Sequence, residues 1–338
     1  MRHSLMMAFL VLFPVAASGQ SVELRPIDPV SMPVIVDSNT PSFWSAGGFH
    51  AFSSSGEPLL SQAASPFSPW TTTASRLVGL PQPAWVESVH QEDDGTLLVW
   101  YHHEVLNVCP GSLLTTPKIG AAISYDGGHT LINLGFVLDS REPPDCSSPN
   151  GYFAGGHGDF SVIYNPRDQH FYFFFSTYSR DLDSQGIAVA RLAWEDRFTP
   201  VGSVFKYHDG GWWEAGLGGR VTPVFPASTS WHETGTDAFW GPSVHWNTHL
   251  GKFVMLLNRS CCEPGWPQEG VYLSMSSSPT DPTTWSAPVR IVEGGEWYPH
   301  VLGLGPYETS SIAGETALLF LGNTAQYEIV FTPAPPVE

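Results

Sequence analysis

The sequence predicts an all-β fold, a five-bladed β-propeller, because three short strand motifs recur in the same order along its 338 residues. Each repeat opens with Pro, Phe or Glu, then Ser, then Val or Phe, as in Pro41-Ser42-Phe43. An apolar strand passes ten residues after that Ser, and in three repeats a Gly then opens a third apolar strand. The composition agrees, since 33 Gly, 30 Pro and 13% aromatic residues favour many short strands, and we expect almost no helix.

The repeats account for most of the chain. The opening motifs lie at residues 41–43, 87–89, 160–162 and 242–244, and residues 297–301 begin a fifth copy. The Gly motifs lie at residues 120–124, 186–190 and 270–274. Because stacked blades bury one continuous core, we expect residues 20–338 to form a single propeller domain.

The first 19 residues are typical of a secretory signal peptide. Arg2 and His3 precede an apolar run at residues 5–17, and small residues follow just before Gln20. That run is too short to span a bilayer. We therefore expect a secreted or periplasmic protein whose mature chain begins near Gln20, and a buried N-terminal strand is the alternative.

The charge balance limits the partners of the protein. Its 14 Lys plus Arg residues face 32 Asp plus Glu residues, giving a net charge of -18. Such a surface repels phosphate backbones and anionic lipids, so we expect neither a nucleic acid nor a membrane as partner. A neutral oligo- or polysaccharide fits an acidic, aromatic-rich surface better, and we expect a monomer.

The four cysteines indicate disulfide bonds in a secreted protein. Cys109 and Cys146 fall in loops that a propeller places on one face, so we predict a bond between them. Cys261 and Cys262 are adjacent, and the sequence leaves open whether they pair.

Blade geometry predicts which residues face the axial funnel, because the first strand of each blade starts there and the second returns to it. The second strand of blade two ends in the run His102-His103-Glu104. Polar side chains at these strand ends can hydrogen-bond to sugar hydroxyls, and aromatic ones can stack on sugar rings. We therefore predict a substrate-binding set of Asn39, Trp85, Glu87, His102, His157, Tyr178, Trp240, Arg259, Trp297 and His300. No His pair has zincin spacing, so we predict no catalytic metal.

The order of motifs over residues 34–331 resembles the five-bladed glycoside hydrolases of the arabinanase, β-xylosidase and α-L-arabinofuranosidase group. The resemblance is carried by Asp37 ahead of blade one, Gly158-Asp159 at blade three and Trp240-Gly241-Pro242 at blade four. It implies that Asp37 is the base and that Asp159 orients the substrate and tunes the pKa of the acid. The acid Glu of that group is replaced here by Trp240.

Three carboxylates are candidates for the missing acid. We favour Glu269, which opens the third strand of blade four, over Glu214 and Asp237. The predicted protein is a secreted, inverting glycoside hydrolase that acts on arabinose- or xylose-type glycans and requires no cofactor. The resemblance also allows a hydrated Ca²⁺ on the axis, with His157 or His300 near it. Two alternatives remain, namely a carbohydrate-binding propeller without catalysis and a sialidase-like or lyase enzyme.

Overall fold

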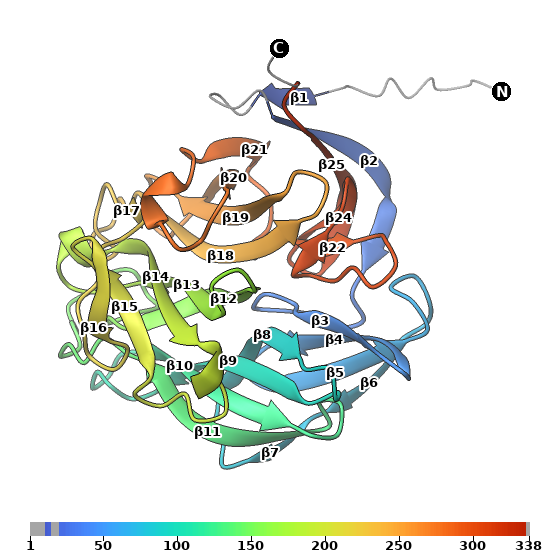
Figure 1. Cartoon of the computed structure of the whole chain (residues 1–338). Helices are drawn as coiled ribbons and strands as arrows, with labels where there is room; N and C mark the ends of the chain where they lie inside the picture. Colours follow the sequence, from blue (N-terminus) through green and yellow to red (C-terminus); the bar gives the residue numbers. More distant parts are fainter. Residues whose placement is uncertain (1–10, 15–19, 336–338) are drawn as a thin grey trace.

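The computed structural model describes residues 11–14 and 20–335, and Figure 1 shows five sheets arranged around a central axis. The predicted five-bladed β-propeller is therefore confirmed. Three short 3-10 helices, Leu182–Ser184, Trp194–Asp196 and Pro282–Thr284, are the only helices in the described part of the chain. None of the described helices has the length and apolar character needed to cross a membrane.

Each blade is an antiparallel meander whose first strand lines the axis. Blade one consists of β3 Ser42–Ser45, β4 Gly48–Ser54, β5 Pro58–Ala63 and β6 Thr71–Ala74. Blade two consists of β8 Ala84–Gln91, β9 Leu97–Val105, β10 Thr116–Ser124 and β11 Thr130–Leu138, with β7 Arg76–Val78 parallel to β11. Blade three consists of β12 His157–Asn165, β13 His170–Thr177, β14 Gly186–Ala193, β15 Val204–His208, β16 Gly211–Ala215 and the short β17 Phe225–Pro226.

The last two blades complete the ring. Blade four consists of β18 Ala238–Asn247, β19 Lys252–Ser260, β20 Gln268–Ser276 and β21 Val289–Glu293, with β23 Ile312–Ala313 parallel to β18. Blade five consists of β22 His300–Gly303, β24 Thr316–Leu321, β25 Thr324–Thr332 and β2 Ser21–Ser31. Every predicted opening motif lies within an innermost strand or overlaps its start.

Blade five joins the two ends of the chain, which the sequence motifs did not predict. Its outermost strand, β2, comes from the N-terminal part and pairs antiparallel with β25 near the C-terminus. Figure 1 shows the two strands side by side, blue against red. Because the ring closes only when these strands pair, the two ends of the chain stabilise the fold together.

The predicted signal peptide falls mostly outside the described residues. Val11–Pro14 form β1, which pairs with β2, while residues 1–10 and 15–19 are not described. The signal peptide therefore stays a prediction.

The repeated serines connect neighbouring blades. The Ser88 hydroxyl accepts a hydrogen bond from the backbone N–H of Val162 at 2.8 Å, and Ser161 accepts one from Val244 at 3.0 Å. Each serine thus satisfies a backbone donor on the innermost strand of the next blade, in a buried setting where an unpaired donor is costly. This geometry explains the small hydroxyl side chain at Ser88 and Ser161, whereas Ser42 pairs with Ser310 and the Val86 N–H on blade two donates to Ser54 instead.

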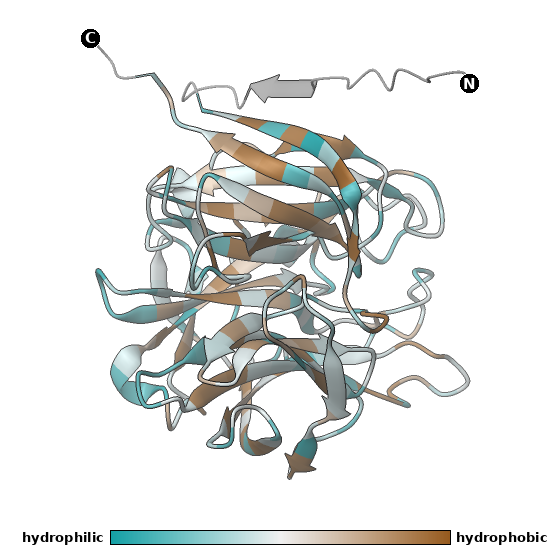
Figure 2. Ribbon diagram, turned by 90° about the vertical axis from the view of Figure 1, so that its right-hand side faces the viewer, coloured by the Kyte–Doolittle hydropathy of each residue, from teal (hydrophilic) through white to brown (hydrophobic). Residues whose placement is uncertain are grey.

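Aromatic and aliphatic side chains fill the spaces between blades. Phe171, Phe173 and Phe175 on β13 pack against blade two, whereas Tyr172 and Phe174 point the other way toward blade four. This alternation is expected of a strand buried on both faces. Figure 2 shows the same contrast along the chain, with apolar residues concentrated on strands and polar residues on many of the loops.

Candidate active site

The candidate site lies on the face of the propeller where the innermost strands begin, which we call the entry face. Its central residue is Asp159 on β12, which is 3% exposed. Asp159 lies at a β-bulge between Gly158 and Phe160 and has a φ of 40°. A bulge releases one residue from the sheet pairing and redirects its side chain. The missing Cβ of Gly158 also matters, because a Cβ there would lie 2.8 Å from the His102 ring.

Two tyrosines hold the Asp159 carboxylate. The Tyr178 hydroxyl donates to Oδ2, and the Tyr298 hydroxyl donates to Oδ1 at 3.2 Å. Tyr178 follows β13 and Tyr298 precedes β22, so residues from blades three and five meet at this carboxylate. Both tyrosines are buried, and burial together with the Asp159 charge raises their pKa values well above the usual range. They therefore stay protonated and act as hydrogen-bond donors.

Blade two supplies a buried histidine and carboxylate beside Asp159. Glu87 lies at a second bulge, between Val86 and Ser88, and its Oε1 is 3.1 Å from Nδ1 of His102. The same Nδ1 is 3.8 Å from Oδ1 of Asp159. Burial disfavours the charged imidazole, but the hydrogen bond to Glu87 and the nearby carboxylates outweigh it and raise the pKa of His102. These neighbours therefore favour the protonated form of His102.

Two further carboxylates, Asp37 and Glu104, are open to solvent around this buried core. Asp37 is exposed overall, but its carboxyl group is largely desolvated. This desolvation is the main cause that raises its pKa to about 6, and the negative charges of Asp159 and Glu104 add to the shift. Glu104 on β9 accepts from the Thr115 hydroxyl at 3.1 Å, and its carboxylate has a side-chain exposure of 23%. Burial also raises the pKa of Glu104, although the charge of His102 opposes the shift.

Asn39 is buried at the centre of the propeller, where its side chain hydrogen-bonds to neighbouring blades. Its side-chain amide donates to the carbonyl oxygens of Phe160 at 2.9 Å and Pro242 at 3.2 Å, and lies 3.5 Å from Glu87. Asn39 is 4% exposed. These contacts connect the start of blade one to blades two, three and four and occupy the donors predicted to bind substrate.

Aromatic side chains form one wall of the site. Trp240 stands where the resemblance places the acid Glu, is 2% exposed and donates from Nε1 to the Ser260 hydroxyl at 3.0 Å. Its ring packs edge-on against Trp297 and Tyr298, with centroids 5.4 and 5.6 Å away. Trp240 is thus part of a hydrophobic cluster, and the half-buried Trp297 is its partner nearer to solvent. On the opposite wall, the half-buried Trp85 lies 5.4 Å from the His102 ring.

The structure does not bring Glu269 together with Asp159. The Glu269 carboxylate forms an ion pair with Arg290 on β21 and accepts from the Tyr272 hydroxyl at 2.5 Å. A second guanidinium, that of Arg259, lies 3.9 Å away. These partners belong to the second, third and fourth strands of blade four, so Glu269 is part of an ion-pair network on that blade.

The other two acid candidates are also paired with arginines. Glu214 binds Arg220 at 3.0 Å, and hydrogen bonds from the Arg220 backbone and side chain lower the pKa of Glu214. Asp237 forms two hydrogen bonds with Arg259, at 2.9 and 3.0 Å. Arg259 was predicted to bind substrate, and its guanidinium is instead engaged by carboxylates of its own blade. This pairing also weakens the sialidase alternative, which needs free arginines.

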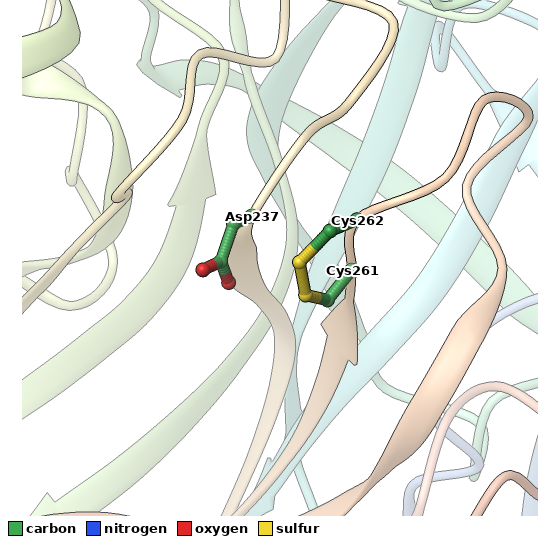
Figure 3. Close-up of side chains that lie close together, drawn as sticks. All are labelled: Asp237, Cys261 and Cys262. Atoms are coloured by element: carbon green, nitrogen blue, oxygen red, sulfur yellow. A yellow bond between two sulfur atoms is a disulfide. The ribbon is translucent and has the colours of Figure 1, made fainter.

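The predicted disulfide between Cys109 and Cys146 is confirmed, with an S–S distance of 2.02 Å. Cys261 and Cys262 are also bonded to each other. Figure 3 shows this pair beside Asp237, at the ends of two neighbouring strands.

The two axial histidines differ in environment. Nε2 of His157 is 3.0 Å from the ammonium group of the buried Lys206, so His157 does not suit a neighbouring cation. His300 is different, because its Nδ1 lies 3.1 Å from the Tyr298 carbonyl while its buried Nε2 has no partner among the described residues. His300 and Glu87 both line a narrow channel on the axis. Burial lowers the pKa of His300 to about 4, so its neutral ring can accept a hydrogen bond from water around a cation.

Comparisons with known proteins find related folds only. No protein-family model and no curated protein sequence matches the chain. The α-L-arabinofuranosidase from Lactobacillus brevis is 11% identical, with a TM-score of 0.53 over 91% of this chain and 97% of that one. The α-L-arabinanase from Cellvibrio cellulosa is 8% identical, with a TM-score of 0.51 over 89% and 92%. These similarities support the propeller fold that the resemblance implied.

One longer protein also matches. The chain covers 64% of the exo-β-1,3-galactanase from Phanerochaete chrysosporium, at 13% identity and a TM-score of 0.49 over 91% of this chain.

The sequence predicted most of this cluster, whereas the structure places Glu269 among the arginines of blade four. Asp37, Asp159, Glu87, His102 and Tyr178 were all predicted to face the funnel, and the structure groups them. Glu104 was placed at the funnel but received no role. Its spacing indicated a role at the site, because Glu104 comes two residues after His102 on the same strand and residues at this spacing share one face.

Proposed function

We propose that this protein is a secreted glycoside hydrolase that cleaves neutral glycans of the arabinose or xylose type. The observation that carries the proposal is the pair of solvent-accessible carboxyl groups, Asp37 and Glu104, whose pKa values are both raised around a buried ionic core. Glycosidic cleavage needs one protonated and one ionised carboxyl group in the same site. The fold shared with the arabinofuranosidase and the arabinanase supports the same reaction class by analogy alone.

The two carboxyl groups differ in ways that separate their roles. The charge of Asp159 adds to the raised pKa of Asp37, which reaches about 6. The positive His102 acts more directly on Glu104, whose Oε1 is 3.9 Å from Nε2 of that ring. In the proposed mechanism Asp37 holds a proton at mildly acidic pH and protonates the leaving oxygen, and Glu104 activates water, which are the two roles of an inverting hydrolase. This assignment replaces the base role that the resemblance implies for Asp37.

The remaining residues bind and orient the sugar. Trp297 and Trp85 are half-buried and present ring surface on which a sugar can stack. Asp159 supports the site indirectly, because it accepts a hydrogen bond from Tyr298 and its negative charge raises the pKa of Asp37. The reaction proposed here uses only side chains. A Ca²⁺ in the axial channel near His300 would supply positive charge beneath Glu87 and would contribute to the stability of the site.

The test is a hydrolysis screen of the purified protein on arabino-, xylo- and galacto-oligosaccharides, with Glu104→Gln as the matched inactive variant. We expect reducing ends from at least one neutral glycan, with the anomer of the product inverted. Because Asp37 must be protonated, activity should fall as the pH rises through about 6. Hydrolysis that Glu104→Gln leaves unchanged would reject the site.

A non-catalytic carbohydrate-binding propeller is the second candidate, and Trp240 favours it. A buried indole occupies the place where the resemblance puts the acid. Binding of the same glycans without any hydrolysis would support this candidate over the enzyme.

A further inference from the structure

A second cavity opens on the entry face, next to the candidate active site. It has a volume of about 710 Å³ and lies between the outer part of blade four and the turn that joins β24 to β25. We call this cavity the rim groove, and its lining includes Ile35, Val36, Glu296, Asn323, Gln326 and Tyr327. Figure 1 shows the strands that border it, β21 and the pair β24 and β25. Its volume lies within the range of small-molecule sites.

Two chain segments lead from the rim groove directly into the carboxylate cluster. Ile35 and Val36 line the groove, and Asp37 follows them in the chain. In the second segment Glu296 lines the groove, Trp297 comes next, and the hydroxyl of Tyr298 donates to Asp159. The groove and the cluster are therefore neighbouring parts of one surface.

Hydrogen bonds fix the wall between them. The backbone N–H of Gly322 donates to the Trp297 carbonyl at 2.6 Å, and the N–H of Met32 donates to the Asn323 carbonyl at 2.8 Å. The β24–β25 turn is thus attached both to the segment that carries Trp297 and to the segment that leads to Asp37. A fixed wall lowers the conformational entropy that binding would cost.

The lining of the rim groove suits a neutral, hydroxyl-rich chain. Gln326 offers an amide donor and acceptor, Glu293 and Glu296 offer acceptors only, and Tyr327 is half-buried. The Asn323 amide is partly engaged, since it donates to the Val34 carbonyl at 3.5 Å and accepts from the Thr324 hydroxyl at 3.2 Å. No Lys, Arg or His contributes to the lining in the described part of the chain. Ile35 is 79% exposed and adds apolar surface for the C–H face of a sugar. An anionic ligand would be repelled by the two carboxylates.

We propose that the rim groove binds the sugar units of an oligosaccharide that extend beyond the carboxylate cluster, so that the protein prefers chains of several sugars. This inference rests on the proposed glycan function. Binding in the groove does not require catalysis, and the two can be tested separately.

The experiment measures the affinity of the full protein for arabino-, xylo- and β-1,3-galacto-oligosaccharides, from disaccharide to hexasaccharide, by titration calorimetry. Affinity for the glycan that binds should rise with chain length, and Tyr327→Ala should weaken the longest chain about three- to tenfold while leaving the disaccharide unchanged. Tyr125→Ala is the matched control, because Tyr125 is 70% exposed at the β10–β11 turn on the opposite face. It should change neither affinity.

Affinity that is independent of chain length, or equal losses in Tyr327→Ala and Tyr125→Ala, would overturn the rim groove. The hydrolysis screen gives an independent result. Length-dependent binding that Tyr327→Ala removes would support the groove even if no glycan were cleaved, and that outcome would reject only the catalytic proposal.

Discussion

Replacing Asp159 by Asn tests whether the buried core of the site depends on a negative charge. The carboxylate accepts hydrogen bonds from Tyr178 and Tyr298 and lies 3.8 Å from His102. A hydrogen bond to a charged group contributes roughly 1 kcal/mol more than a neutral one, so losing the charge should lower the free energy of unfolding by about 2 kcal/mol. For a chain of this length that corresponds to a decrease in Tm of about 3 °C. Because Asp159 is only 3% exposed, stability should respond to this change as well as activity.

Activity should fall far more than stability in this variant. Asp159 fixes Tyr298 and raises the pKa of Asp37, so Asp159→Asn should reduce kcat/KM by about two orders of magnitude or more. Asp168→Asn is the matched control, because Asp168 also accepts from a tyrosine hydroxyl, that of Tyr172, at the β12–β13 turn on the opposite face. It should lose stability and keep activity. Thermal unfolding and steady-state kinetics measure both quantities. Full activity in Asp159→Asn would show that the site does not need this charge.

Three further predictions concern stability. Ser161→Ala should cost about 1 to 3 kcal/mol in urea unfolding, because it leaves the buried Val244 N–H unpaired, and an unchanged midpoint would contradict the role of the repeated serines. Replacing Cys109 and Cys146 by Ser should cost about 2 to 4 kcal/mol, since the bond closes a loop of 37 residues, and equal stability of the oxidised and reduced protein would argue against this. Burial lowers the pKa of His245 to about 3, below its unfolded value of 6.5, so its contribution to stability is present above pH 6.5 and is lost as the pH falls toward 3. His245→Leu should therefore reduce the slope of unfolding free energy against pH in this window by about 1.4 kcal/mol per unit, and an identical slope would show that the ring is not buried in its neutral form.

The repeat motifs predicted the fold well because they report a local requirement. Ser88 and Ser161 each pair with the next blade and are followed by strands buried on both faces, so the same short pattern recurs in the sequence. The closure of blade five by β2 was not predictable in this way, since its strand carries no copy of the motif and its partner is near the other end of the chain.

Site residues on the innermost strands were predicted for a similar reason. Glu87 and Asp159 lie at bulges next to the repeated motif, so their position follows from the motif itself. The surroundings of Glu269 were not predictable in this way. Its strand position is as expected, but the direction of its side chain is decided by Arg259 and Arg290, whose proximity depends on how the strands of blade four pair.

In the proposed mechanism Asp37 and Glu104, and not Glu269, act on the glycosidic bond. The most direct measurement compares kcat/KM for unactivated oligosaccharides and for aryl glycosides with good leaving groups, in Asp37→Asn, Glu104→Gln and Glu269→Gln. Asp37→Asn should slow the unactivated substrates about 100-fold or more and the activated ones much less, because only the former need a donated proton. Glu104→Gln should slow both, and Glu269→Gln should slow neither. Leaving-group dependence in Glu269→Gln, together with unchanged kinetics in Asp37→Asn, would contradict the account.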